Sequence, residues 1–225
     1  MSPSNAPILS SCRAFLKEAL SLGVFLLVAL AMRSSIAATY YVPSGSMEPS
    51  VYTGDRLMAY QHSYGLRIPF TDRLLSSQSA PSYGDIVVFV DPRDPQTLLL
   101  KRVIAVGGDR LAIRDGVILR NGVPLPQSPA LQKDGWLQRI ESNGKHRYVV
   151  QFEPSQPFLR DIPAQMIPQG HFFAMGDNRD HSGDSRVFGS VPIQNLRARA
   201  VRVLWSRDPA TFWDIRWSRS GRSLR

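Results

Sequence analysis

The chain has 225 residues, of which 43% are hydrophobic and 20% are charged, and its formal net charge is +9. This length and composition are typical of one folded domain with an elaboration, or of two small domains, and they exclude a large multidomain protein. The single cysteine, Cys12, excludes an intramolecular disulfide and a cysteine-based zinc site.

The first expected element is a membrane helix. Residues 19–32 contain no charged residue, and extending the segment to Val42 gives about 36 Å of helix, enough to cross a hydrocarbon core of about 30 Å. Cations before this stretch favour a cytoplasmic location for residues 1–18. A cleavable signal peptide is the alternative, because Ser35-Ile36-Ala37 has the small residues of a cleavage site. We expect the segment to be retained.

After Pro43 the pattern changes to short strands separated by Gly, Pro and Asp. Asp115-Gly116 and Asn121-Gly122 indicate hairpin turns, and no βαβ spacing is visible. The sequence therefore predicts a mainly β, antiparallel body of residues 43–123 and 170–205. Residues 124–169, rich in Pro and Gln, are expected to form a small, irregular inserted lobe. Strands are expected at residues 55–60, 85–90, 98–106, 110–114, 117–119, 148–152, 171–175 and 198–204.

Residues 206–225 form a basic, aromatic C-terminal tail. Arginines alternate there with Trp213 and Trp217, a mixture that suits a solvated end, a lipid headgroup zone or stacked nucleic acid bases. We expect the tail to assist membrane contact. Removing the residues after Thr211 should then leave the chemistry of the protein intact.

The sequence gives little support for a metal site or for a catalytic histidine. The four histidines, His62, His146, His171 and His181, show no HExxH or paired spacing. The acidic loop of residues 177–186 lacks the Gly and Glu of a calcium-binding EF-hand loop. Because its arginines stand beside carboxylates, an internal ion-pair network is the preferred interpretation. No metal and no cofactor are expected.

A serine and a lysine are the candidate catalytic groups. Gly45 allows an unusual turn in the segment Pro43–Pro49, although such clusters are more often linkers. Strand alternation places Lys101 on the same face as Leu99 and Val103. Burial would lower the pKa of this lysine and let it act as a base. The alternative is an edge-strand lysine that reaches solvent.

Five segments in this order resemble the bacterial type I signal peptidases, or leader peptidases. The resemblance extends over about residues 40–200, and it departs from the family at His181, where the family usually has Asn. The segments are Pro43-Ser44-Gly45-Ser46-Met47, Gly54-Asp55, Tyr83–Phe89, Lys101-Arg102-Val103 with Gly108-Asp109, and Gly176–Asp180 with Ser182, Asp184 and Arg186.

This resemblance implies a membrane-anchored serine endopeptidase that removes signal peptides after small residues, at Ala-x-Ala sites. Ser46 would be the nucleophile and Lys101 the general base. The backbone N–H of Ser46 and the hydroxyl of Ser44 would form the oxyanion hole, and Ser182 would orient the Lys101 amine. Residues implied to support the loop are Asp177, Arg179, Asp184 and Arg186. Residues implied to bind substrate are Val42, Pro43, Met47, Val88, Leu98, Leu99 and Leu100.

The expected partners are the signal peptides of exported preproteins and the lipid bilayer, with no nucleic acid. The expected location is the bacterial inner membrane, crossed once, with the catalytic domain on the periplasmic side. Three alternatives remain open at this point: a membrane-anchored basic β-domain that binds nucleic acid, a processing peptidase dedicated to a secretion or conjugation system, and a self-cleaving regulator. The oligomeric state is also open.

Overall fold

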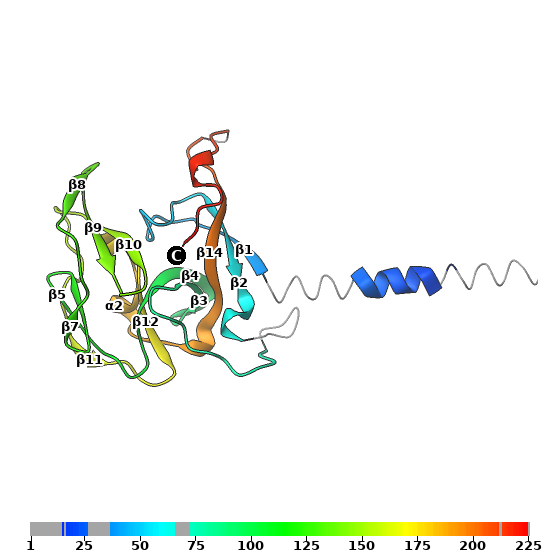
Figure 1. Ribbon diagram of the computed structural model, residues 1–225, viewed down its shortest axis with the longest axis horizontal. Coiled ribbons are helices and arrows are strands. Elements are labelled where there is room, and N and C mark those ends of the chain that lie inside the picture. Colours follow the sequence, from blue (N-terminus) through cyan, green and yellow to red (C-terminus); the bar gives the residue numbers. More distant parts are fainter. Residues whose placement is uncertain (1–14, 16, 27–36, 66–72, 212, 225) are drawn as a thin grey trace, which may run out of the picture.

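The computed structural model describes residues 15, 17–26, 37–65, 73–211 and 213–224 (Figure 1). Residues 17–26 are helical, but none of the described helices is long and apolar enough to cross a bilayer. Residues 27–36 of the expected membrane segment, which include the first two residues of the alternative cleavage site, lie outside the described residues. The expected end of the helix at Val42 is wrong, because residues 37–41 form a strand.

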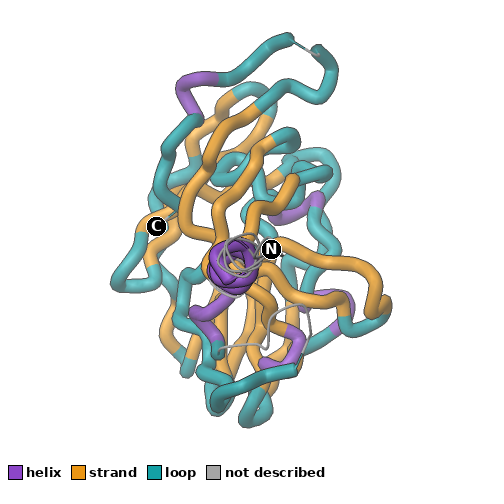
Figure 2. The backbone as a smooth tube through the Cα atoms, turned by 90° about the vertical axis from the view of Figure 1, so that its right-hand side faces the viewer, coloured by secondary structure: helices purple, strands orange, loops and turns teal. Residues whose placement is uncertain are grey.

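Strands are the main regular secondary structure of the described chain (Figure 2). The strands are β1 (Ala37–Tyr41), β2 (Asp55–Tyr60), β3 (Ile86–Asp91), β4 (Asp94–Val106), β5 (Arg110–Arg114), β6 (Val117–Arg120), β7 (Val123–Pro124), β8 (Leu131–Lys133), β9 (Trp136–Ser142), β10 (Arg147–Phe152), β11 (Ile162–Met166), β12 (His171–Met175), β13 (Val191–Pro192) and β14 (Leu196–Ser206). The helical turns are α2 (Ser185–Phe188), η1 (Gln61–Tyr64), η2 (Arg179–His181), η3 (Ile193–Asn195) and η4 (Trp217–Arg219).

The strands form three sheets. The largest has seven strands in the order β1-β2-β14-β3-β4-β12-β13, and the others have the orders β10-β9-β8 and β11-β5-β6-β7. All the pairings are antiparallel. β14 lies between the β1–β2 pair and the β3–β4 pair. The mainly β, antiparallel prediction is therefore confirmed, and each strand expected from the sequence is present.

The prediction that the inserted lobe is irregular is wrong. Strands β8, β9 and β10 form a sheet of their own, and β11 pairs with β5 outside the lobe. The turn between β8 and β9 is Asp134-Gly135, with φ angles of 50° and 85°. Asp-Gly is a strong signal for a two-residue hairpin turn, and it indicates this hairpin within an otherwise polar segment.

The main core fills the space around the large sheet. Leu57, Ile86 and Val203 are buried together with Met47, from the turn after β1. Phe89 and Phe172 pack edge to face, with ring centroids 5.4 Å apart, in a second cluster that includes Val103. These clusters hold β2, β3, β4 and β14 in fixed register, so the loops at their ends are built on a rigid base.

The C-terminal segment packs on the body of the protein, which corrects the interpretation of it as a separate tail. In Figure 1 it returns beside β14, where the Gly221 amide donates to the Val203 carbonyl and Leu224 is buried. The buried Arg219 side chain donates two hydrogen bonds to Asp55, one of 3.0 Å. Trp213 and Trp217 do face solvent, with 87% and 72% of their surfaces exposed.

Replacing Arg219 with methionine is therefore expected to lower the free energy of unfolding by about 3–5 kcal/mol, because Asp55 would stay buried without its counter-ion. Chemical denaturation measures this change. Arg222→Met, an exposed arginine three residues later, is the matched control and should change stability by less than about 0.5 kcal/mol. Equal stability of the two variants would contradict the expectation. By the same reasoning, removal of the residues after Thr211 should destabilise the body of the protein.

Candidate active site

Ser46 and Lys101 meet in the folded chain. Ser46 lies in the turn after β1 and Lys101 lies in β4, and the Lys101 Nζ donates a 2.7 Å hydrogen bond to the Ser46 Oγ. The lysine is only 3% exposed, and its amine lies against the Ser46 turn. The alternative of a lysine that reaches solvent from an edge strand is therefore wrong.

Burial changes the acid–base character of Lys101. It lowers the pKa of the amine from 10.5 to about 8, although the charges of Asp184 and Asp177 oppose part of this shift. A lysine with such a pKa is neutral in a substantial fraction of molecules near neutral pH. Its free electron pair can then accept the proton of a hydroxyl at hydrogen-bond distance.

The turn that carries Ser46 is held at both ends. The Val42 amide donates to the Asp55 carbonyl, and the Gly54 amide donates to the Val42 carbonyl. Met47 anchors the turn in the core, with 1% of its surface exposed. In the described part of the chain the Ser46 amide makes no hydrogen bond, and the Ser44 Oγ lies 3.5 Å from the Ser46 Oγ. Two donors are thus available beside the nucleophilic oxygen.

The loop of residues 176–186 packs directly against the Ser46 turn. The Asn178 amide donates to the Ser46 carbonyl, and its Nδ2 donates to the Gly45 carbonyl, both at 3.1 Å. Gly176 makes the closest approach: a Cβ atom there would lie 2.3 Å from both the Ser46 carbonyl oxygen and the Ser182 Oγ. Asn178 was not among the candidate site residues, although it lies inside a motif that the resemblance used.

Buried ion pairs hold this loop. Arg102 donates to both carboxylate oxygens of Asp177, at 2.8 and 2.6 Å. Arg186 does the same to Asp184, at 2.9 and 2.8 Å. The Arg179 Nη1 donates at 2.7 Å to Glu141 in β9, which corrects the expectation that it pairs with a neighbouring loop carboxylate. The inserted lobe therefore supplies a counter-ion to the loop that supports Ser46.

Ser182 is placed differently from what the resemblance implies. Its Oγ is buried and has no hydrogen-bond partner among the described residues, so it does not bond the Lys101 amine in this structure. It packs against Gly176, and the Ser46 carbonyl oxygen approaches the same side of that glycine. Its position next to the Ser46 turn is nevertheless as expected from the motif.

A cleft of about 90 Å³ opens beside Ser46 and Lys101. Two backbone edges border it. Among the described residues, β1 pairs only with β2, and residues 98–101 of β4 pair only with β3, since β12 pairs with β4 from Arg102 onward. All the expected substrate-binding residues line the cleft. The lining residues include Val42, Pro43, Met47, Val88, Leu98, Leu99 and Leu100, together with Tyr40, Tyr41, Ser44 and Leu57.

The histidines contribute little to this site. His181 pairs with Glu153 and packs edge to face on Trp136, and His171 contacts the Gln169 carbonyl. In the described part of the chain, no group of three or more His, Cys, Asp or Glu side chains is arranged to hold a metal ion. The arrangement therefore offers a serine nucleophile with a lysine base.

Comparison with known proteins gives consistent matches. The family described as signal peptidase, peptidase S26, matches residues 15–205. The chain is 30% identical to signal peptidase I of Pseudomonas aeruginosa, over 80% of this chain and 69% of that protein. It is 33% identical to a probable signal peptidase I-1 of Synechocystis sp., over 93% and 90%. A crystal structure of a signal peptidase I from Enterococcus faecalis is 26% identical, with a TM-score of 0.36, over 54% of this chain and 97% of that one.

Proposed function

The chain belongs to the signal peptidase, peptidase S26, family, and we propose that it removes signal peptides from exported preproteins with Ser46 as nucleophile and Lys101 as general base. The observation that carries this mechanism is the 2.7 Å contact between the Lys101 Nζ and the Ser46 Oγ. Burial of the lysine supports it, because a desolvated amine loses its proton more readily. The relatives that carry the name signal peptidase I support the substrate class.

The reaction follows from these groups. Neutral Lys101 takes the Ser46 proton as the Oγ attacks the carbonyl carbon of the scissile bond. The Ser46 amide and the Ser44 hydroxyl donate to the developing oxyanion. The Lys101 ammonium then gives its proton to the leaving amine, and the bond between carbon and nitrogen breaks. A water, deprotonated by Lys101, then attacks the acyl carbon, and the bond to the Ser46 Oγ breaks as the Lys101 ammonium gives that proton to the Oγ.

Substrate would bind as an extended strand in the cleft. The free backbone edges of β1 and of residues 98–101 provide main-chain partners for such a strand. The small volume of the cleft, about 90 Å³, favours side chains of the size of alanine. We therefore propose cleavage after Ala-x-Ala.

The test is to incubate the solubilised protein with a preprotein that carries one Ala-x-Ala site and to map the products by mass spectrometry. We expect a single cut after the second alanine, and loss of that cut when this alanine is replaced by leucine. Ser46→Ala protein is the control for a contaminating protease. A cut at another site, or a cut that persists with Ser46→Ala, would contradict the proposal. Several preproteins assayed side by side would separate a general enzyme from one dedicated to a single system.

We also propose that the N-terminal segment is retained and anchors the protein in the bacterial inner membrane, with the catalytic domain on the periplasmic side. The sequence of the apolar stretch supports this, and so does the short distance along the chain from Ala37, where β1 begins, to Ser46. Mature protein should stay with membranes after carbonate washing and keep its N-terminus. Soluble mature protein that begins at Ala38 would contradict the anchor.

The pH dependence of cleavage follows from the pKa of Lys101. As the pH falls below about 8, a growing fraction of the amine is protonated and cannot act as a base, so kcat/KM should rise with pH and level off above this value. Peptide hydrolysis measured from pH 6 to 10 checks the profile, with His181→Ala as the control that should leave its midpoint unchanged. A midpoint near 6.5 that disappears in His181→Ala would point to a histidine base instead.

A further inference from the structure

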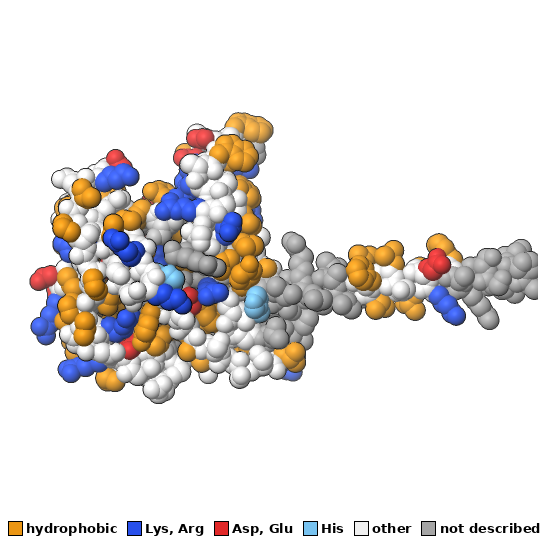
Figure 3. Space-filling model, in the orientation of Figure 1, with side chains coloured by type: hydrophobic (Ala, Val, Ile, Leu, Met, Phe, Trp, Pro, Cys, Tyr) orange, Lys and Arg blue, Asp and Glu red, His pale blue; other side chains and the backbone are white. Residues whose placement is uncertain are grey.

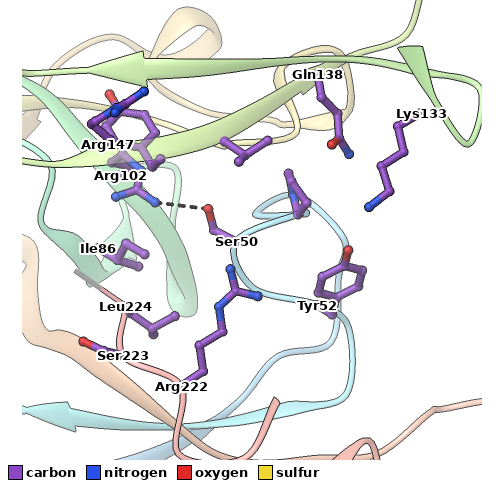
Figure 4. Close-up of a pocket in the computed structure, with 13 residues that line it drawn as sticks. Ser50, Tyr52, Ile86, Arg102, Lys133, Gln138, Arg147, Arg222, Ser223 and Leu224 are labelled. Carbon is purple, nitrogen blue, oxygen red and sulfur yellow. Dashed lines mark hydrogen bonds between the residues drawn. The ribbon is translucent and has the colours of Figure 1, made fainter. Parts of the chain in front are cut away.

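A second, larger cavity lies next to the turn that carries Ser46. It has a volume of about 280 Å³ and is formed where three parts of the chain meet (Figure 4). Ser50 and Tyr52 come from the segment that follows Ser46, Lys133 and Gln138 come from the inserted lobe, and Arg222 comes from the C-terminal segment. The cavity is separate from the substrate cleft, because Lys101 lines the cleft whereas Arg102, the next residue in β4, lines the cavity.

The lining of the cavity carries positive charge only. Four cations line it, namely Arg102, Lys133, Arg147 and Arg222, and its lining includes no Asp or Glu. Arg102 is neutralised by Asp177, whereas the other three make no ion pair with any part of the chain that the structure describes. Figure 3 shows Lys and Arg side chains gathered on the face where the lobe, β14 and the C-terminal segment meet.

Polar groups in the cavity point toward one shared space. In Figure 4, the Lys133 amine and the Arg222 guanidinium point toward the middle of the view from different sides, and the Tyr52 hydroxyl and the Gln138 amide lie on the Lys133 side. Like charges held around one space repel one another unless an anion lies between them. A phosphate group suits this set, because it carries close to two negative charges at pH 7 and several acceptor oxygens. A single carboxylate would balance only one of the three unpaired cations.

We infer that this cavity is a binding site for a phosphate group, held by Lys133 and Arg222 with help from Tyr52 and Gln138. The site touches the catalytic machinery without being part of it. The Ser50 Oγ, in its wall, accepts a hydrogen bond from Arg102, which also holds Asp177. A free phosphate ion and a soluble monoester present close to two negative charges and several free oxygens, whereas the headgroup of a phospholipid is a diester with one negative charge and two free oxygens.

Titration calorimetry on full-length Ser46→Ala protein in detergent tests this inference independently of peptidase activity. Inorganic phosphate, compared with chloride at equal ionic strength, should bind saturably at one site per chain. Lys133→Gln/Arg222→Gln should weaken that binding at least about 10-fold. Arg110→Gln/Arg114→Gln, which removes the same charge from exposed positions of β5, should bind as the parent protein does.

Dihexanoyl phosphatidylglycerol, used below its micelle concentration, distinguishes the sources of the phosphate. If Lys133→Gln/Arg222→Gln weakens the binding of this lipid and Arg110→Gln/Arg114→Gln does not, the cavity is a headgroup site. Binding of inorganic phosphate alone would identify a soluble ligand. Equal affinities of the two double variants for both probes, or no saturable binding of either probe, would overturn the inference.

Discussion

Replacing Lys101 with arginine is expected to lower kcat/KM for preprotein cleavage by at least about 10³-fold, even though the positive charge is kept. A guanidinium has a pKa above about 12, so it cannot lose a proton to become a base at the pH of the assay. Lys145→Arg, at an exposed lysine, is the matched control and should be fully active.

Ser46→Ala and Lys101→Ala should be as inactive as Lys101→Arg, and the double variant should be no worse than either single one. Groups that act as one unit lose their whole contribution when either is removed. Circular dichroism and thermal unfolding would establish that each variant is folded. Substantial turnover by folded Lys101→Arg protein would refute the lysine base. Inactivity of folded His181→Ala or His171→Ala would reopen a histidine mechanism.

Gly176→Ala is expected to lower kcat/KM by about 10²-fold, the cost of a displacement of about 1 Å at a catalytic group. The added methyl group would lie 2.3 Å from the Ser46 carbonyl oxygen, so the turn that holds the nucleophile would have to move. Gly183→Ala is a matched control in the same loop, because a Cβ there meets no atom within 4 Å. The two variants therefore separate the contact from the general effect of a longer side chain.

Steady-state kinetics on a short peptide would show whether Gly176→Ala acts on kcat, as expected for a misplaced nucleophile. Thermal unfolding would show whether the fold survives. Equal activity of Gly176→Ala and Gly183→Ala would contradict the view that close packing at Gly176 positions Ser46. A loss of activity in Gly183→Ala alone would place the sensitive contact elsewhere in the loop.

Much of the sheet could be predicted because its strands show local patterns. Short runs of apolar residues mark β2, β3 and β5, and the side of β4 that carries Lys101 was inferred by counting along one strand. β1 could not be separated from the preceding apolar stretch, since the run from residue 19 to Val42 has a single interruption by charge. Its strand conformation depends on pairing with β2, which is a long-range contact.

The site residues that lie in sequence motifs could be predicted. The contacts between segments that are distant in the sequence could not. Glu141 lies 38 residues before Arg179, in the inserted lobe. No motif in that lobe indicated a role for it. Asn178 and Gly176 matter for the contacts they make with the Ser46 turn, and a single sequence does not show such contacts. Arg219 was interpreted as part of a basic tail. Its burial depends on a contact with Asp55, far away in the sequence, and the local sequence does not show that contact.

The position of β14 in the large sheet sets the order in which the site can be completed. Ser46 follows β1 and precedes β2, whereas Lys101 lies in β4, and β14 is the strand that joins these two halves. A ribosome makes β14 only after residue 195, and chains are synthesised from the N-terminus. A nascent chain therefore carries Ser46 and Lys101, the proposed dyad, well before the strand that joins their two halves of the sheet has been made.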